Sequence, residues 1–179
     1  MVLEQLLALD SSIVLFLVSV RTPWLDLFFR AMTLVGSIYF LALVGLALLA
    51  KNRKAGINFF IGFAVTLGVL FLIKQAVNRP RPFETLPITA LDDENTSSFP
   101  SGHTTDSFYG AAFLSEIYKK FSVAFYFLGL VVFISRIYLG VHYPSDVAAG
   151  AVIGFILGKI FSKIDYEKTF IKIFRQKKF

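Results

Sequence analysis

The stretch AMTLVGSIYFLALVGLALLA, residues 31–50, contains no charged side chain over 20 positions. A helix of about 20 apolar residues crosses the hydrocarbon core of a bilayer, which is about 30 Å thick. A second uncharged run follows at 55–73, and 56% of the 179 residues are hydrophobic. Soluble domains contain about 45–50% apolar residues. The sequence therefore predicts an integral membrane protein with helical spans.

We expect an all-α fold, an integral membrane bundle of six transmembrane helices. The connection at 78–101 contains four prolines and cannot be one continuous helix. Gly150, Gly154 and Gly158 share one face of the last helix, where another helix can approach closely. We expect a single domain over 1–164 and a basic tail over 165–179. The helices are predicted at 4–20, 30–50, 55–77, 102–118, 121–139 and 144–164.

Composition limits the chemistry that this chain can perform. It has no Cys, which excludes disulfides and thiolate metal sites. The net charge of +6 is compatible with nucleic-acid binding, but the basic residues concentrate at the ends of the predicted helices, so we expect no nucleic-acid partner. The acidic run at 92–94 lacks an accompanying His and a clear ligand spacing. We interpret it as a solvated loop, and we expect neither a metal nor another cofactor.

The distribution of Lys and Arg predicts the orientation in the membrane. Six spans place both termini on one side, and the start of the chain lacks the features of a removable signal peptide. Twelve of the 18 Lys and Arg residues then lie on the side of the termini, and six lie on the other. Basic residues favour the cytoplasmic side. We therefore expect a bacterial inner-membrane protein with cytoplasmic termini and an outer face toward the periplasm.

Polar residues of three distant segments meet on that outer face. Cations gathered there can neutralise a dianion such as phosphate, and the fork of an Arg guanidinium fits phosphate oxygens. The Ser-Gly pair at the start of the helix at 102–118 presents backbone N–H groups to an anion. The pattern predicts a phosphate site, with Arg79 in a secondary role. The candidate phosphate-binding residues are Lys74, Arg81, Ser101, Gly102 and Arg136.

The only two histidines of the chain belong to the same face. His142 is a candidate nucleophile, and Asp146, four residues later, can fix its tautomer. His103 can then protonate a leaving oxygen. A lone His at a helix end is more often a cap or a packed side chain, so the interpretation depends on the whole group. Asp106 lies one turn after His103 and either tunes it or caps the helix.

These residues resemble the type 2 phosphatidic acid phosphatase superfamily, whose pattern has three parts. The first, K-x6-R-P, stands as KQAVNRPRP at 74–82. The second, P-S-G-H, stands at 100–103. The third, S-R-x5-H-x3-D, stands as SRIYLGVHYPSD at 135–146. All three parts match without a substitution and in the family order, and the resemblance covers about residues 30–165.

The resemblance implies a six-helix membrane fold and metal-independent dephosphorylation of a lipid. It implies that His142 forms a phosphohistidine, that Asp146 orients it, and that His103 is first the acid and then the base. The five candidate phosphate-binding residues would hold the phosphoryl oxygens. The family also contains soluble vanadium-dependent haloperoxidases, but the continuous apolar spans of this chain argue against that branch.

The three motifs indicate a phosphate group but do not identify the lipid that carries it. Lipid A 1-phosphate is the substrate that we favour, with phosphatidylglycerol phosphate and undecaprenyl diphosphate as alternatives. A non-enzymatic carrier of lipid phosphates would need the cations but not the His-Asp pair. An ion pathway would need charges along the depth of several helices, and the helices at 30–50 and 55–77 offer none within their apolar runs. The sequence does not indicate an oligomeric state.

Overall fold

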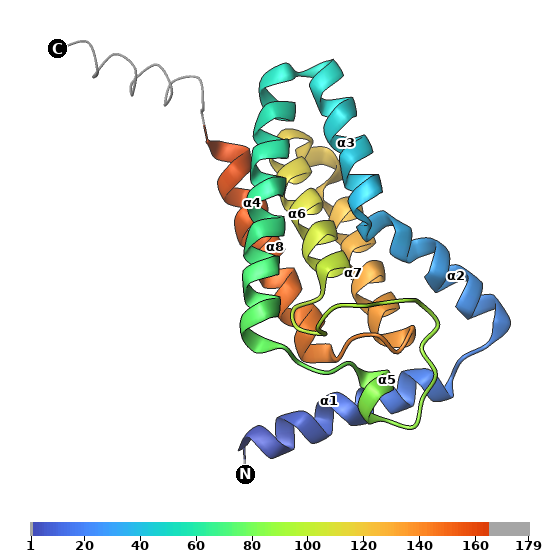
Figure 1. Ribbon diagram of the computed structural model, residues 1–179. Coiled ribbons are helices and arrows are strands. Elements are labelled where there is room, and N and C mark those ends of the chain that lie inside the picture. Colours follow the sequence, from blue (N-terminus) through green and yellow to red (C-terminus); the bar gives the residue numbers. More distant parts are fainter. Residues whose placement is uncertain (1, 165–179) are drawn as a thin grey trace.

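The computed structural model describes residues 2–164, and this part of the chain is helical without a strand (Figure 1). Two short 3-10 turns, η1 (Leu34–Gly36) and η2 (Lys119–Phe121), interrupt the α-helices. The predicted tail at 165–179 lies outside the described residues. The α-helices are α1 (Val2–Ser19), α2 (Pro23–Thr33), α3 (Ile38–Lys51), α4 (Arg53–Val77), α5 (Pro82–Thr85), α6 (Gly102–Ile117), α7 (Ser122–Tyr138) and α8 (Pro144–Lys163).

Helix α6 lies inside the bundle, and its contact with α8 is the most extensive between two helices. A Cβ atom added at Gly150 would lie 2.7 Å from the Ser101 carbonyl oxygen, and one at Gly158 would lie 2.5 Å from that of Tyr109. Both distances are shorter than a carbon–oxygen contact allows, so only glycine permits this approach. The predicted role of these glycines in helix packing is confirmed.

The continuous helix predicted at 30–50 is wrong. Helices α2 and α3 meet at η1 with a bend of 48°. Ser37 starts α3 by accepting a hydrogen bond from the Phe40 N–H at 3.2 Å. At the break, a Cβ on Gly36 would lie 2.5 Å from the carbonyl oxygen of His103. The bend therefore lets this segment pack against the first turn of α6.

Three helical segments in the described part of the chain are long and apolar enough to cross a membrane, or four if the bent pair is one span. The predicted count of six spans is thus not confirmed. Helix α1 lies obliquely across one end of the bundle, beside α5 (Figure 1). Helix α8 ends at the opposite end of the molecule. The long connection between α4 and α6 covers the same end as α1 and α5.

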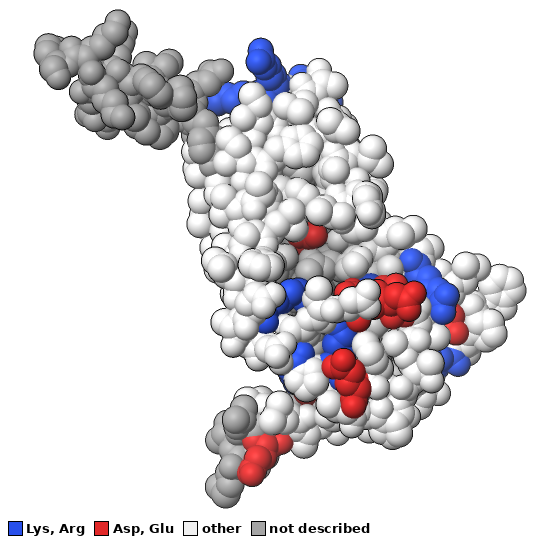
Figure 2. Space-filling view, viewed as in Figure 1, with Lys and Arg blue, Asp and Glu red and all other residues white. Residues whose placement is uncertain are grey.

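Charged side chains gather toward the two ends of the molecule, and the body between them is mostly uncharged on the face shown in Figure 2. Large apolar side chains are exposed along the helices of this body, including Leu43, Leu72 and Phe127. Such a surface is costly in water and suits a hydrocarbon environment. The described helices therefore form a body whose apolar surface suits a membrane, with a polar layer at the end near α5.

Candidate active site

The structure brings the three sequence motifs together at the end of the bundle covered by the connection between α4 and α6. Lys74 lies in the last turn of α4, and its Nζ donates to the Ser97 carbonyl oxygen. The Ser101 N–H donates to the carbonyl oxygen of Asp146 at 3.1 Å, which joins the second motif to the third. Residues up to about 70 positions apart in the chain thus share one site.

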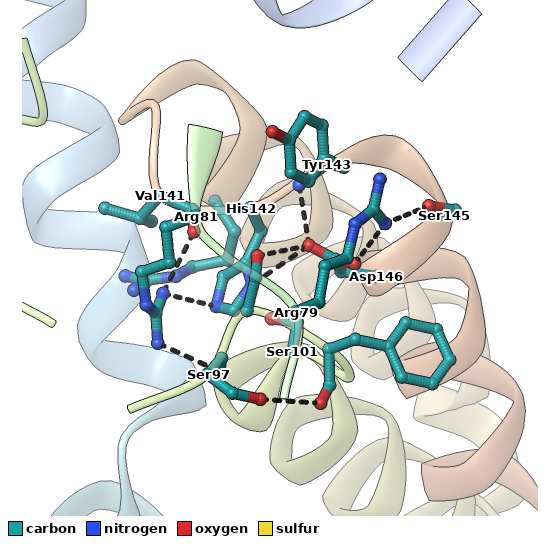
Figure 3. A network of polar contacts seen from close by, with 12 residues as sticks. Arg79, Arg81, Ser97, Ser101, Val141, His142, Tyr143, Ser145 and Asp146 are labelled. Carbon is teal, nitrogen blue, oxygen red and sulfur yellow. Dashed lines mark hydrogen bonds and ion pairs between the residues drawn. The ribbon is translucent and has the colours of Figure 1, made fainter. Parts of the chain in front are cut away.

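His142 is 1% exposed and lies in the loop between α7 and α8. Its Nδ1 is 3.6 Å from Asp146 Oδ2, and its Nε2 is 3.3 Å from Arg81 Nη1 (Figure 3). A guanidinium can only donate, so Nε2 carries the lone pair and Nδ1 carries the proton. Burial, assisted by the charges of Arg136 and Arg81, lowers the pKa of His142 to about 3. The ring is therefore neutral at neutral pH, and Nε2 faces the arginine.

Asp146 is fully buried and lies in the first turn of α8. Its Oδ2 accepts hydrogen bonds from the Tyr143 N–H at 2.9 Å and from Ser98 Oγ at 2.5 Å. Its Oδ1 accepts from Arg79 Nη1 at 2.6 Å. Figure 3 shows the carboxylate between His142 and Arg79. A buried carboxylate with this many donors stays charged and keeps a fixed orientation toward the imidazole.

The two predicted arginines are among the largest fully buried side chains in the described residues. Arg81 donates to the carbonyl oxygens of Thr96 at 2.7 Å and Val141 at 2.9 Å. Arg136 extends from α7, and its Nη1 donates to Thr33 Oγ1 at 2.7 Å. Its Nε has no hydrogen-bond partner within the described part of the chain. A buried donor without an acceptor is unfavourable, and this N–H is available to an additional acceptor.

The acidic run is not simply a solvated loop. Asp92 pairs with Arg136 at 2.6 Å, and Glu94 pairs with Arg136 at 2.5 Å and with Arg81 at 2.9 Å. Glu94 Oε1 also lies 3.7 Å from Nδ1 of His103. Two buried cations require nearby anions when no other ligand is bound. The carboxylates of this run therefore supply the negative charge that the arginines need.

The start of α6 provides the remaining predicted residues. Ser101 is the N-cap and accepts a hydrogen bond from the Thr104 N–H at 3.4 Å. Gly102 begins the helix, and a Cβ added there would meet no other atom within 4 Å, so the space beside it is open. His103 follows with a partly exposed side chain. Asp106 is buried and does not cap the helix, because Ser101 does.

Several neighbours of these residues were not predicted. Ser98 and Thr33 are ordinary hydroxyl residues whose contacts depend on the fold, so no sequence signal marks them. Asp10 contacts Arg79 at 2.9 Å, and the signal was present, since it is the only charged residue in the apolar run at 5–20. Arg79, to which we gave a secondary role, contacts both Asp10 and Asp146.

The sequence matches the PAP2 superfamily over residues 55–170, a range that contains all three motifs. The chain belongs to the PAP2 superfamily. The bacitracin transport permease protein BcrC of Bacillus licheniformis is 38% identical over 131 residues, which are 69% of this chain and 64% of that protein. This chain thus spans somewhat less than two thirds of that relative. The decaprenylphosphoryl-5-phosphoribose phosphatase of Mycobacterium tuberculosis is 35% identical over 69% of each chain.

Solved structures of PAP2 proteins have the same fold. The crystal structure of LpxE from Aquifex aeolicus superposes with a TM-score of 0.81 and 30% identity, over 87% of this chain and 96% of that one. The transmembrane PAP2-type phosphatidylglycerolphosphate phosphatase of Bacillus subtilis superposes with a TM-score of 0.75 and 25% identity, over 89% of this chain and 86% of that one. The PAP2 resemblance seen in the three motifs is confirmed. These relatives place the chain among membrane phosphatases, a class of phosphoric ester hydrolases.

Proposed function

We propose that this PAP2 protein is a metal-independent lipid phosphate phosphatase that works through a phosphohistidine on His142. One observation carries the proposal. The buried imidazole is held between a carboxylate at Nδ1 and an arginine at Nε2, which leaves its lone pair directed to the place where the buried guanidinium groups converge. A nucleophile oriented by a third group beside an anion site is the arrangement that covalent catalysis requires.

In the proposed first step the phosphoryl group binds to Arg81, Arg136 and the N–H groups at the start of α6. Lys74 adds a third positive charge. The Nε2 lone pair of His142 attacks phosphorus, and the bond between phosphorus and the lipid oxygen breaks. His103 donates a proton to that oxygen, and Asp146 stabilises the positive charge that develops on the His142 ring.

In the second step water completes the hydrolysis. His103, now neutral, takes a proton from a water molecule, whose oxygen attacks the phosphohistidine. The P–N bond breaks, inorganic phosphate leaves, and His142 regains its neutral form. Binding requires Asp92 and Glu94 to release the two arginines, because the carboxylates and the phosphoryl oxygens compete for the same donors.

The location of the site suits a lipid whose phosphate lies at the membrane surface. The site occupies the polar end of an apolar body, so a lipid can enter from the side with its chains in the bilayer. We propose that this end faces the periplasm, across the inner membrane of a bacterium. The opposite end exposes Lys51, Arg53 and Lys120, whereas arginines near the site are paired with acids. This asymmetry supports a cytoplasmic opposite end.

We propose lipid A 1-phosphate as the substrate, with phosphatidylglycerol phosphate and undecaprenyl diphosphate as the alternatives. Relatives named for lipid A, phosphatidylglycerophosphate and undecaprenyl diphosphate all resemble this chain at 28%, 29% and 33% identity. The three motifs are the proposed phosphoryl contacts, and they do not separate these three lipids.

The test is phosphate release by the purified protein in detergent with a chelator present, on these three lipids and phosphatidic acid. We expect release from at least one lipid, at a rate that the chelator does not change. The His142→Ala variant is the control. Lipid binding without phosphate release by the unaltered protein would contradict hydrolysis and support a carrier of lipid phosphates.

A further inference from the structure

Helix α1 carries one buried acid on an otherwise lipid-like surface. Asp10 is 7% exposed, whereas Leu6, Leu7 and Leu9 beside it are among the exposed apolar residues. A carboxylate at the edge of a bilayer is costly unless it is paired or has a function. Asp10 therefore needs a physical explanation, and its contacts provide one.

Asp10 binds the first turn of α8 directly. Its Oδ1 accepts the Ser145 N–H at 2.9 Å, and its Oδ2 accepts a hydrogen bond from Ser145 Oγ. The first N–H groups of a helix have no partner within the helix, so Asp10 acts as a cap supplied by another helix. Ser145 immediately precedes Asp146. The contact consequently fixes the backbone next to the carboxylate that orients His142.

Asp10 also reaches the same carboxylate through a second route. Arg79 Nη2 donates to Asp10 Oδ2 at 2.9 Å, and Arg79 Nη1 donates to Asp146 Oδ1 at 2.6 Å. The guanidinium carbon lies 3.9 Å from the centre of the Tyr143 ring, which further restrains it. Arg79 is thus held between two acids, one on α1 and one on α8.

These polar contacts add to an apolar link, in which Val14 of α1 is buried against Ile137, Tyr143 and Val147. A groove of about 710 Å³ runs beside them, and its walls are mostly apolar, including Ile13, Val77 and Phe133. Asp10 and Arg79 line the same groove and bridge α1 to the start of α8.

We infer that Asp10 is a positioning residue for Asp146, acting through Arg79 and the first turn of α8, so that α1 is part of the catalytic unit. The inference rests on the proposed function. In the intact site Asp10 shares the charge of Arg79, which contacts Asp146 through Oδ1, while Asp146 Oδ2 faces the His142 Nδ1–H. Without Asp10, Arg79 pairs with Asp146 alone, and the stronger attraction draws the Asp146 carboxylate away from the His142 imidazole.

The structure predicts which kinetic constant changes. Among the contacts of the described residues, Asp10 has none with Lys74, Arg81 or Arg136, so the phosphate-binding cations keep their places when it is changed. We expect kcat to fall while KM stays within about twofold. A displacement of about 1 Å in an orienting group costs up to about a hundredfold in rate. We expect about tenfold for Asp10→Asn, which keeps an acceptor for the Ser145 N–H, and a larger loss for Asp10→Ala.

The experiment is a double-mutant cycle on the lipid that the unaltered protein hydrolyses best. The variants are Asp10→Asn, Arg79→Gln and their combination, with Ser12→Ala as the matched control on α1. Ser12 is exposed and donates to the Ala8 carbonyl oxygen of its own helix. If Asp10 acts through Arg79, the double variant has the same kcat as Arg79→Gln alone, and the control is unchanged.

Three results would overturn the inference. The first is a kcat for Asp10→Asn equal to that of the unaltered protein. The second is a double variant in which the separate losses of kcat from Asp10→Asn and Arg79→Gln multiply. That result would indicate that Asp10 only attaches α1, and the melting temperatures of the variants would then fall in step with their kcat values. The third is no turnover by the unaltered protein on any lipid, which contradicts the proposed function itself and is thereby distinguishable from the other two.

Discussion

Replacing Glu94 by Gln should strengthen the binding of phosphate. In the structure Glu94 contacts both buried arginines, at 2.9 Å and 2.5 Å, so an incoming phosphoryl group must displace it. A hydrogen bond to a charged group contributes about 1.5–3 kcal/mol. The Gln amide keeps one acceptor oxygen, but its NH2 group cannot accept from the second arginine, so the substitution removes one contact of about 2 kcal/mol. A loss of about 2 kcal/mol corresponds to about thirtyfold in affinity.

The assay is the inhibition constant of inorganic phosphate, and of orthovanadate, measured against lipid hydrolysis. We use inhibition instead of kcat because Glu94 also lies 3.7 Å from His103, so its removal can alter proton transfer. Asp93→Asn is the matched control, since Asp93 is exposed in the same loop and forms no salt bridge within the described residues. An inhibition constant for Glu94→Gln that is unchanged or higher, with Asp93→Asn behaving identically, would refute the competition between carboxylate and phosphate.

Three further substitutions test separate parts of the account. His142→Ala should reduce phosphate release by about four orders of magnitude or more, because a lost nucleophile cannot be replaced by its neighbours; ordinary turnover in this variant would disprove the assignment. Ser98→Ala removes a 2.5 Å hydrogen bond to Asp146 and should lower kcat several-fold with little change in KM, whereas an effect on KM alone would contradict the orienting role. Gly158→Ala places a methyl group 2.5 Å from the Tyr109 carbonyl oxygen and should lower the free energy of unfolding by about 1–3 kcal/mol. Gly68→Ala, where the methyl group meets nothing within 4 Å, is its control, and equal melting temperatures for the two would contradict the packing argument.

The sequence predicted the meeting of the three motifs better than it predicted the helices that hold them. The three motifs have fixed spacings, and the apolar runs between them bring their polar ends to one face, so Arg81, His142 and Asp146 could be placed together before any coordinates. The bend between α2 and α3 was missed because the run at 31–50 is uniformly apolar. Its cause, the approach of Gly36 to the backbone of His103, is a tertiary contact that no local pattern records.

The polar neighbours of the site were missed for a related reason. An acidic run after a proline-rich segment has the composition of a solvated loop, and only the fold shows that Glu94 reaches Arg81 and Arg136. The charge of a buried arginine nevertheless requires an anion. The run at 92–94 is the nearest acidic cluster in the same connection, so its composition is compatible with neutralising Arg81 and Arg136.

The measurement that tests the central claim most directly is the trapping of phosphate on the protein. The purified protein is mixed with its best lipid substrate, labelled in the phosphoryl group, in the presence of a chelator, and is quenched in alkali within milliseconds. The account predicts a label that is stable in base, labile in acid and located on His142 by peptide mass spectrometry, and absent from the His142→Ala variant. Release of free phosphate at the normal rate with no such label at any time would contradict the phosphohistidine.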